Sequence, residues 1–179
     1  NDVNNDVNND VNNDVNNDVN NDAPQFRFVL VEDQTANTSG DFPGSDVDAI
    51  GLIKGDGSGE VFASSVEEDS DVPCEGGNLA CDTNALTGAP DVVDGGNCFG
   101  GGAPDGSLFT ALNQGFVIVG FGDNVIENGD SVHVYEIGAT ECGRFDNDPF
   151  SVSVSVSDDI NGDFIEMGTG GAGSNIVPI

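Results

Sequence analysis

Short runs in which apolar and polar residues alternate recur along most of this chain, separated by turn-forming residues. Such alternation is typical of a strand with one buried face, because successive side chains of a strand point to opposite faces. The clearest run, FSVSVSV, predicts a strand with its valines inward and its serines outward. The run GFVIVGF is almost continuously apolar and predicts a central strand. We predict strands at residues 25–32, 48–54, 60–64, 115–121, 131–137, 150–156, 163–167 and 175–179.

This succession of short strands and turns predicts an all-β fold, a jelly-roll-like β-sandwich with an extended N-terminal arm. Turns rich in Gly, Asn and Asp are expected at residues 55–59, 128–130 and 160–162. Residues 66–107 form a long stretch rich in Gly, Cys and acidic residues, which is unusual for a loop of a compact domain. We therefore expect covalent links to hold this stretch.

The first 22 residues repeat the tetrapeptide Asn-Asp-Val-Asn. A polar tract of this kind buries too little apolar surface to offset its own ordering entropy. Fully extended, it would reach roughly 70 Å at about 3.3 Å per residue. We divide the chain into an arm, residues 1–24, and a β-sandwich domain, residues 25–179. The arm either lies on a neighbouring copy of the chain or serves as a flexible spacer.

The chain is strongly acidic, with 33 Asp and Glu residues, three Lys and Arg residues and a net charge of −30. Phosphate binding needs Lys and Arg, so nucleic acid is excluded as a partner. No apolar run has the length that membrane insertion requires. Ca²⁺ is the natural counter-charge because it takes several hard oxygen ligands, although the acidic surface also fits simple solubility.

The four cysteines form no C-x-x-C motif, so two disulfides in an oxidising compartment are favoured over a zinc site. Four cysteines allow three pairings, of which we prefer the local one, Cys74–Cys81 with Cys98–Cys142. The chain has one glycosylation sequon, at Asn37. These features predict an extracellular or cell-surface protein.

Five motifs follow one another along the chain: DVDAI at 46–50, ALTGAPD at 85–91, GFVIVGFG at 115–122, DSVHVYE at 130–136 and VSVSVSD at 152–158. Their order resembles secreted bacterial cell-surface modules with a discoidin-like, galactose-binding-like jelly roll. The resemblance covers about residues 46–168 and departs from the pattern at Thr87 and in the Cys-rich stretch.

The resemblance implies a Ca²⁺ site built from loop carboxylates and from the Glu that ends the Tyr-Glu strand. Carboxylates at strand ends can also converge on one cation for physical reasons alone. For each of them the alternative is a solvated turn residue. The candidates are Asp46, Asp48, Asp91 and Glu136, with Asp146 and Asp148 as further candidates in a neighbouring acidic loop.

Nothing in the sequence indicates catalysis, and we predict that the chain is not an enzyme. The single histidine, His133, has no G-x-S-x-G motif to support a catalytic triad. Strand alternation places it with Ser131 and Tyr135, opposite Val132 and Val134, and we expect it to be exposed.

Two hypotheses of function remain. In the first, the chain is a structural subunit of an extracellular filament, a homopolymer assembled head to tail through the arm and stabilised by disulfides and Ca²⁺. The arm would act alone or with a donated or edge strand containing Phe26, Phe28, Val29, Leu30 and Val31. In the second, it is a Ca²⁺-dependent carbohydrate-binding or adhesive module that binds glycans.

Overall fold

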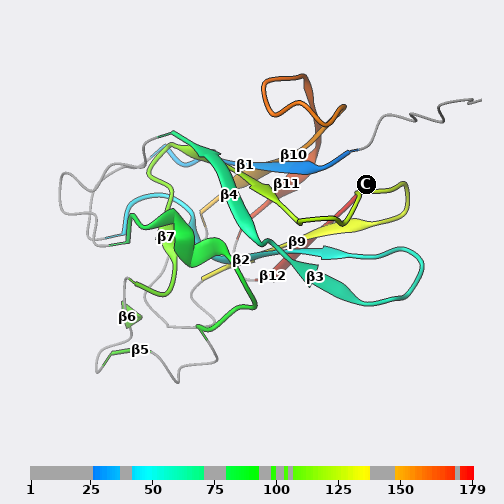
Figure 1. The fold of residues 1–179 in the computed structure, drawn as a ribbon. Helices are drawn as coiled ribbons and strands as arrows, with labels where there is room; N and C mark the ends of the chain where they lie inside the picture. The colour runs from blue at the N-terminus through cyan, green and yellow to red at the C-terminus, as the bar shows by residue number, and fades with distance from the viewer. Residues whose placement is uncertain are drawn as a thin grey trace, which may run out of the picture.

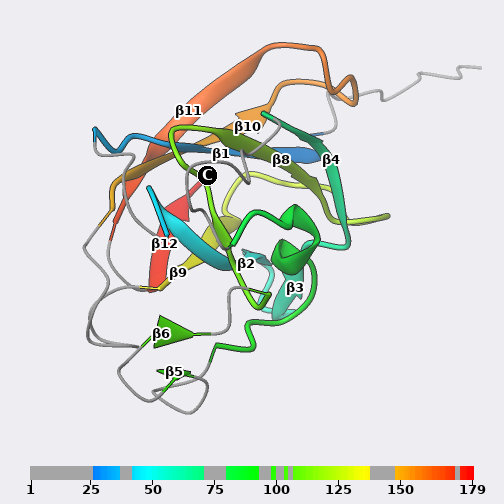
Figure 2. The same ribbon diagram turned by 90° about the vertical axis from the view of Figure 1, so that its left-hand side faces the viewer.

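The computed structural model describes residues 26–36, 42–70, 80–92, 98–99, 103–104, 107–137, 148–171 and 174–179. Two antiparallel sheets pack face to face as the two layers of a sandwich, which Figure 2 shows edge on. The predicted all-β sandwich is therefore confirmed. No helix in the described part is long and apolar enough to cross a membrane.

The first sheet has the order β11-β10-β1-β8-β4. Its strands are β1 (Phe28–Asp33), β4 (Ser65–Asp69), β8 (Phe116–Gly120), β10 (Phe150–Ser155) and β11 (Phe164–Gly170). The second sheet has the order β12-β9-β2-β3, and β7 also pairs with β2. Its strands are β2 (Asp46–Ile53), β3 (Glu60–Phe62), β7 (Thr110–Ala111), β9 (Ser131–Glu136) and β12 (Ser174–Pro178).

Two smaller elements complete the described chain. A 3₁₀ turn, η1 (Thr83–Leu86), is capped at its N-terminus by Asp82, whose side chain accepts a hydrogen bond from Asn84 N. The short strands β5 (Cys98–Phe99) and β6 (Ala103–Pro104) pair with each other, apart from both layers (Figure 1).

The core lies between the two sheets, where alternate residues of facing strands meet. In the first sheet β1, β8 and β10 each contribute two fully or almost fully buried valines, and in the second sheet β2 and β9 supply the opposing apolar residues. This packing follows from the period-two pattern, because every second side chain of these strands points to the same face. The main contributors are Val29, Val31, Val117, Val119, Val152, Val154, Val47, Ile50, Leu52, Val132 and Val134.

β1 is a central strand of its own domain rather than an edge or donated strand. It pairs with β10 on one side and with β8 on the other, as the blue strand of Figure 1 shows. The side chains of Val29 and Val31 are fully buried in the core. The sequence hypothesis that residues 26–31 are an assembly strand is corrected accordingly. The backbone N–H and C=O groups of β1 already pair with β8 and β10 of the same chain.

Two serines of β10 are buried, although the sequence pattern predicted that they face outward. Ser151 and Ser155 are buried, while Val152 and Val154 point into the core as predicted. Ser155 Oγ accepts hydrogen bonds from Arg27 N and from Phe28 N at 3.1 Å, so burial leaves this hydroxyl with partners. Small hydroxyl side chains are tolerated inside when they are hydrogen-bonded.

The strand register defines two ends of the sandwich. At the carboxylate end, Asp33 pairs with Phe150 in the first sheet and Val47 pairs with Glu136 in the second. Ser45 links the two sheets there, because its hydroxyl donates to Asp33 Oδ1 at 3.1 Å. At the opposite end, which we call the arm end, Phe28 pairs with Gly120 and Ile53 pairs with Ser131.

Candidate functional site

Two neighbouring strands bring acidic residues together at the carboxylate end. β2 begins at Asp46 and β9 ends at Glu136, and Ile137 N donates a hydrogen bond of 2.7 Å to Asp46 O. The two side chains are only 1% and 2% exposed. Because a buried carboxylate loses its hydration, such a pair is costly unless protons, donors or a cation compensate it.

Asp46 and Glu136 each have one carboxylate oxygen that accepts no hydrogen bond from the described residues. In Asp46 this atom is Oδ1, and in Glu136 it is Oε1. Burial raises the pKa of Asp46 well above its usual value, and the negative charges of Glu136, Asp148 and Asp33 raise it further. A nearby positive charge would stabilise the ionised form of Asp46. Carboxylate oxygens are ligands that Ca²⁺ prefers.

Asp33 lies at the same end, but its carboxylate is fully engaged. Oδ1 accepts hydrogen bonds from Thr35 N at 2.9 Å and from Ser45, and Oδ2 accepts one from Gln114 N at 2.6 Å. Asn113 and Gln114 have φ values of 49° and 62°, which is uncommon outside glycine. This backbone turns the N–H of Gln114 toward Asp33, so we assign Asp33 a structural role.

Glycine is required at position 44 beside this carboxylate. Its φ is +83°, and a Cβ there would collide with Asp33 Oδ2 and lie 2.7 Å from Asn113 N. The side-chain oxygen of Asn113 is itself buried and, within the described part of the chain, accepts no hydrogen bond. The carboxylate end thus holds three buried oxygens that accept no hydrogen bond from the described residues, namely Asp46 Oδ1, Asn113 Oδ1 and Glu136 Oε1.

Asp48 and Asp91 form a different arrangement from the one predicted for them. Asp48 lies at a bulge between Val47 and Ala49, and its carboxylate accepts hydrogen bonds from Asp91 N at 3.2 Å and Val92 N at 3.1 Å. Burial raises the pKa of Asp48 to about 6, although these backbone hydrogen bonds act in the opposite direction. Asp48 therefore fastens residues 91–92 to the second sheet, while the side chain of Asp91 is exposed.

Only a few side chains at the carboxylate end could therefore bind a cation. Among the described residues, no three His, Cys, Asp or Glu side chains form a group arranged to hold a metal ion. Asp46 and Glu136 have the burial and oxygen chemistry of Ca²⁺ ligands. Asp148, half-buried, acts on Asp46 through its charge.

A second polar cluster lies on the outer face of the second sheet. Glu60 Oε1 contacts His133 Nδ1 at 2.7 Å, and Tyr135 donates a hydrogen bond of 2.9 Å to Glu60 Oε2. His133 is 8% exposed, so the expectation of an exposed histidine is corrected. Burial and the contact with Glu60 raise the pKa of Tyr135 above its usual value.

Glu60 was not predicted from the sequence as a site residue, although Gly51 gives one signal of a close approach. Gly51 lies opposite both His133 and Phe62 in the register, and a Cβ at Gly51 would collide with the Glu60 side chain. A glycine inside a strand often marks a place where another group approaches closely. The register that identifies this group as Glu60 comes only with the fold.

Several predicted residues are only partly covered by the structure. Cys81 is disulfide-bonded, and no free cysteine is found in the described part. The pairings Cys74–Cys81 and Cys98–Cys142 each involve a residue outside that part, so the connectivity stays a prediction. The glycosylation residue Asn37 and the candidate ligand Asp146 also lie outside the described residues.

The chain matches no protein-family model, no curated protein and no solved structure. The similarity to discoidin-like surface modules therefore remains a resemblance based on the motifs given above.

Proposed function

We propose that this chain is a non-catalytic structural subunit of an extracellular filament. Its copies join head to tail through the N-terminal arm, and Ca²⁺ stabilises the carboxylate end of each domain. The observation that carries this proposal is the buried carboxylate of Asp46, which has no described donor to Oδ1 and lies near three other acidic side chains.

Ca²⁺ fits this arrangement better than other common cations. The groups at this end are oxygens, which disfavours Zn²⁺ and other metals that prefer nitrogen or sulfur. Asp46 and Glu136 would bind the ion, and carbonyl oxygens or water would complete its coordination, as is usual for Ca²⁺. The bound ion would neutralise a carboxylate pair that is otherwise buried at a cost.

Charge also connects calcium with assembly. Each copy carries a net charge of −30, so copies repel one another at low ionic strength. Divalent cations reduce that repulsion and allow acidic domains to pack closely. The disulfide at Cys81 and the arm with its valine repeat fit a protein that works outside the cell as part of an assembly.

Negative-stain electron microscopy of the full chain, with Ca²⁺ and after chelation, tests the proposal. We expect regular filaments in Ca²⁺ under oxidising conditions and shorter or no filaments after chelation. Light scattering on the same samples gives the mass distribution. A monodisperse, globular monomer in Ca²⁺ would overturn the proposal.

One observation favours a second candidate, a Ca²⁺-dependent carbohydrate-binding module. The rings of Phe62 and Tyr135 have centroids 6.0 Å apart on the outer face of the second sheet, beside Glu60 and His133. Aromatic faces next to polar groups suit contact with sugars. Retention on a glycan array that is lost on chelation and in a Tyr135→Ala variant would support this candidate, and a blank array would exclude the glycans tested.

A further inference from the structure

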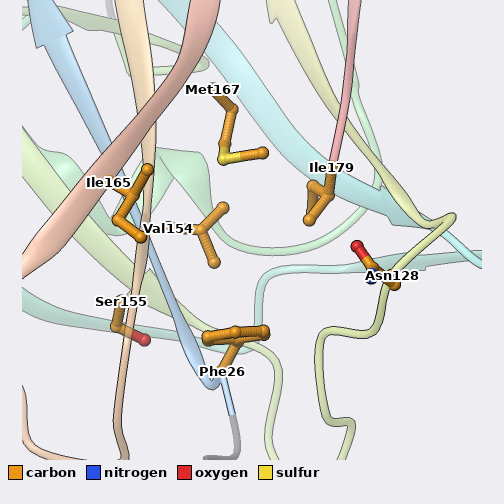
Figure 3. A pocket seen from close by; sticks show the side chains of 7 residues that line it. All are labelled: Phe26, Asn128, Val154, Ser155, Ile165, Met167 and Ile179. Atoms are coloured by element: carbon orange, nitrogen blue, oxygen red, sulfur yellow. The ribbon is translucent and has the colours of Figure 1, made fainter.

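An apolar groove lies at the arm end of the sandwich. It has a volume of about 160 Å³, and Figure 3 shows its lining side chains gathered around it, with Met167 at one end and Phe26 at the other. They come from the segment two residues before β1, from β10 and β11, from the turn before β9 and from the residue after β12. The lining residues are Phe26, Asn128, Val154, Ser155, Ile165, Met167 and Ile179.

The chemistry and size of the groove indicate what it accepts. No charged side chain lines it, which is notable in a chain with a net charge of −30. Pockets for drug-sized ligands usually measure about 300–1,000 Å³, so this groove is too small for them. A space near 150 Å³ holds roughly one benzene-sized apolar group, which is comparable to one or two aliphatic side chains.

The groove lies along an edge strand. Among the described strands, β11 has a hydrogen-bonded neighbour, β10, on one side only. The C-terminal part of β11 lies close to β12, because a Cβ at Gly168 would be 3.0 Å from Val177 Cγ1. Ile165 and Met167 precede this approach and line the groove, and Ile165 is 55% exposed. An extended segment placed here can pair with the strand edge and insert alternate side chains.

The N-terminal arm has the matching pattern. Its valines recur at every fourth residue, so in an extended chain they all point to one side, about 13 Å apart. Between two successive valines, one Asn shares their face, while the acidic Asp and the other Asn point to the opposite face and can remain in water. The arm joins the domain at Phe26, which is itself a wall of the groove.

The length of the arm favours the groove of a neighbouring copy. A domain of this size is about 40 Å across, and 22 extended residues reach roughly 70 Å. About 12 residues then pass along one domain, and about ten remain to dock with two or three valines. Filling a groove on the same domain would need far fewer residues.

We propose that the groove receives valine side chains of the N-terminal arm of a neighbouring copy, and that the arm pairs with the edge of β11. This inference rests on the proposed function, because it identifies the surface through which filament subunits join. The arm and the groove are different surfaces, so the contact is heterologous, and it extends into a filament when the rotation between successive copies does not close a ring.

Full-length variants test the groove against a matched control. Ile165 and Ile176 are both isoleucines on strands and are 55% and 57% exposed, but only Ile165 lines the groove. We expect Ile165→Asn to raise the critical concentration for assembly roughly tenfold, because the variant loses about half the burial of an isoleucine at the contact. Ile176→Asn should assemble like the unaltered chain. Replacing Val3, Val7 and Val11 by Asn should weaken assembly from the other side of the contact, because these valines lie in the distal part of the arm that remains to dock.

A photo-reactive residue at position 7, in the distal part of the arm, locates the contact directly. In a mixture of ¹⁵N-labelled and unlabelled full-length chains, we expect cross-links between copies at Ile165 or Met167. Cross-links only within one chain, or closed dimers, would overturn the inference. Filaments that form equally well with Ile165→Asn and Ile176→Asn would overturn the groove but leave the proposed function standing. A chain that never assembles would overturn both.

Discussion

Glu60 reaches across Gly51 to contact His133, with 2.7 Å between Glu60 Oε1 and His133 Nδ1. Three strands take part in this contact, because Glu60 belongs to β3, Gly51 to β2 and His133 to β9. The missing side chain at Gly51 allows the carboxylate to lie on the sheet, where it also accepts the hydrogen bond from Tyr135. On the outer face of the second sheet, the Glu60 carboxylate thus connects β3 to the side chains of β9.

Gly51→Ala should destabilise the domain by roughly 1–3 kcal/mol, since the new methyl group displaces Glu60 from its two partners. Chemical denaturation of the two proteins measures this loss. In a Glu60→Ala background the same substitution should cost clearly less, because no carboxylate remains to be displaced. Equal losses in both backgrounds would show that crowding by Glu60 is not the cause.

Lys54→Met should cost about 3–5 kcal/mol of stability, the range seen when one partner of a buried ion pair is removed. Lys54 Nζ lies 2.5 Å from Asp130 Oδ2 and donates to Val125 O at 2.8 Å, and Asp130 is 2% exposed. Although burial alone would raise the pKa of Asp130, hydrogen bonds from Lys54, Gly55 and Glu127 lower it, so the carboxylate stays ionised.

Denaturant unfolding of Lys54→Met alone and combined with Asp130→Asn checks this interpretation. The double variant should be more stable than Lys54→Met, because it leaves no unpaired buried charge. A double variant that is less stable than either single one would contradict the assigned role of the pair.

The stability contributed by Asp48 should fall as the pH rises from about 4 to 7. The pKa of Asp48 is about 6 in the folded chain against 3.8 for the free side chain, so the folded state holds the proton more tightly. Its contribution is complete below pH 3.8 and is lost as the pH passes 6. At about 1.4 kcal/mol per pKa unit, the loss is at most about 3 kcal/mol.

Calcium-free unfolding at several pH values, comparing the chain with Asp48→Asn, measures that difference. The difference in stability between the two proteins should change with pH in this direction, since Asn does not titrate. Asp123→Asn, at an exposed turn residue, provides the control for the change in net charge.

Asp46→Asn should have opposite effects with and without Ca²⁺. After chelation the variant should be more stable than the unaltered chain by about 1–3 kcal/mol, because it removes an uncompensated buried charge. With Ca²⁺ at 100 times its dissociation constant, the unaltered chain should gain about 2.7 kcal/mol and the variant much less. Thermal unfolding in both conditions decides the matter, and equal calcium effects in both proteins would exclude Asp46 as a ligand.

Most of the fold could be predicted from the sequence because its strands carry their pattern locally. The runs at β1, β8, β9 and β10 alternate or are continuously apolar, and each falls within two or three residues of its predicted bounds. β4 was missed because its sequence, SVEED, is acidic and lies at an edge where two of its five residues are exposed and none is buried. Such a strand is held by backbone pairing with β8 rather than by a buried face.

The candidate site was less accessible to sequence reasoning. Asp46 and Glu136 were predicted from a motif resemblance, but their burial depends on how β2 and β9 pair and on the segments around Ser45 and Asn113. The bulge that separates the roles of Asp46 and Asp48 has no local signature. The contact of Glu60 with His133 needs the register of three strands, which alternation alone does not determine.

The central position of β1 also has a mechanical consequence. The arm continues directly into this strand, so a pull on the arm acts along the strand axis. β1 is bonded to β10 and to β8 through ladders whose hydrogen bonds run across that axis. A pulling force must therefore shear both ladders together instead of opening them one bond at a time, so the arm is joined to the domain through a strand that is held on both sides.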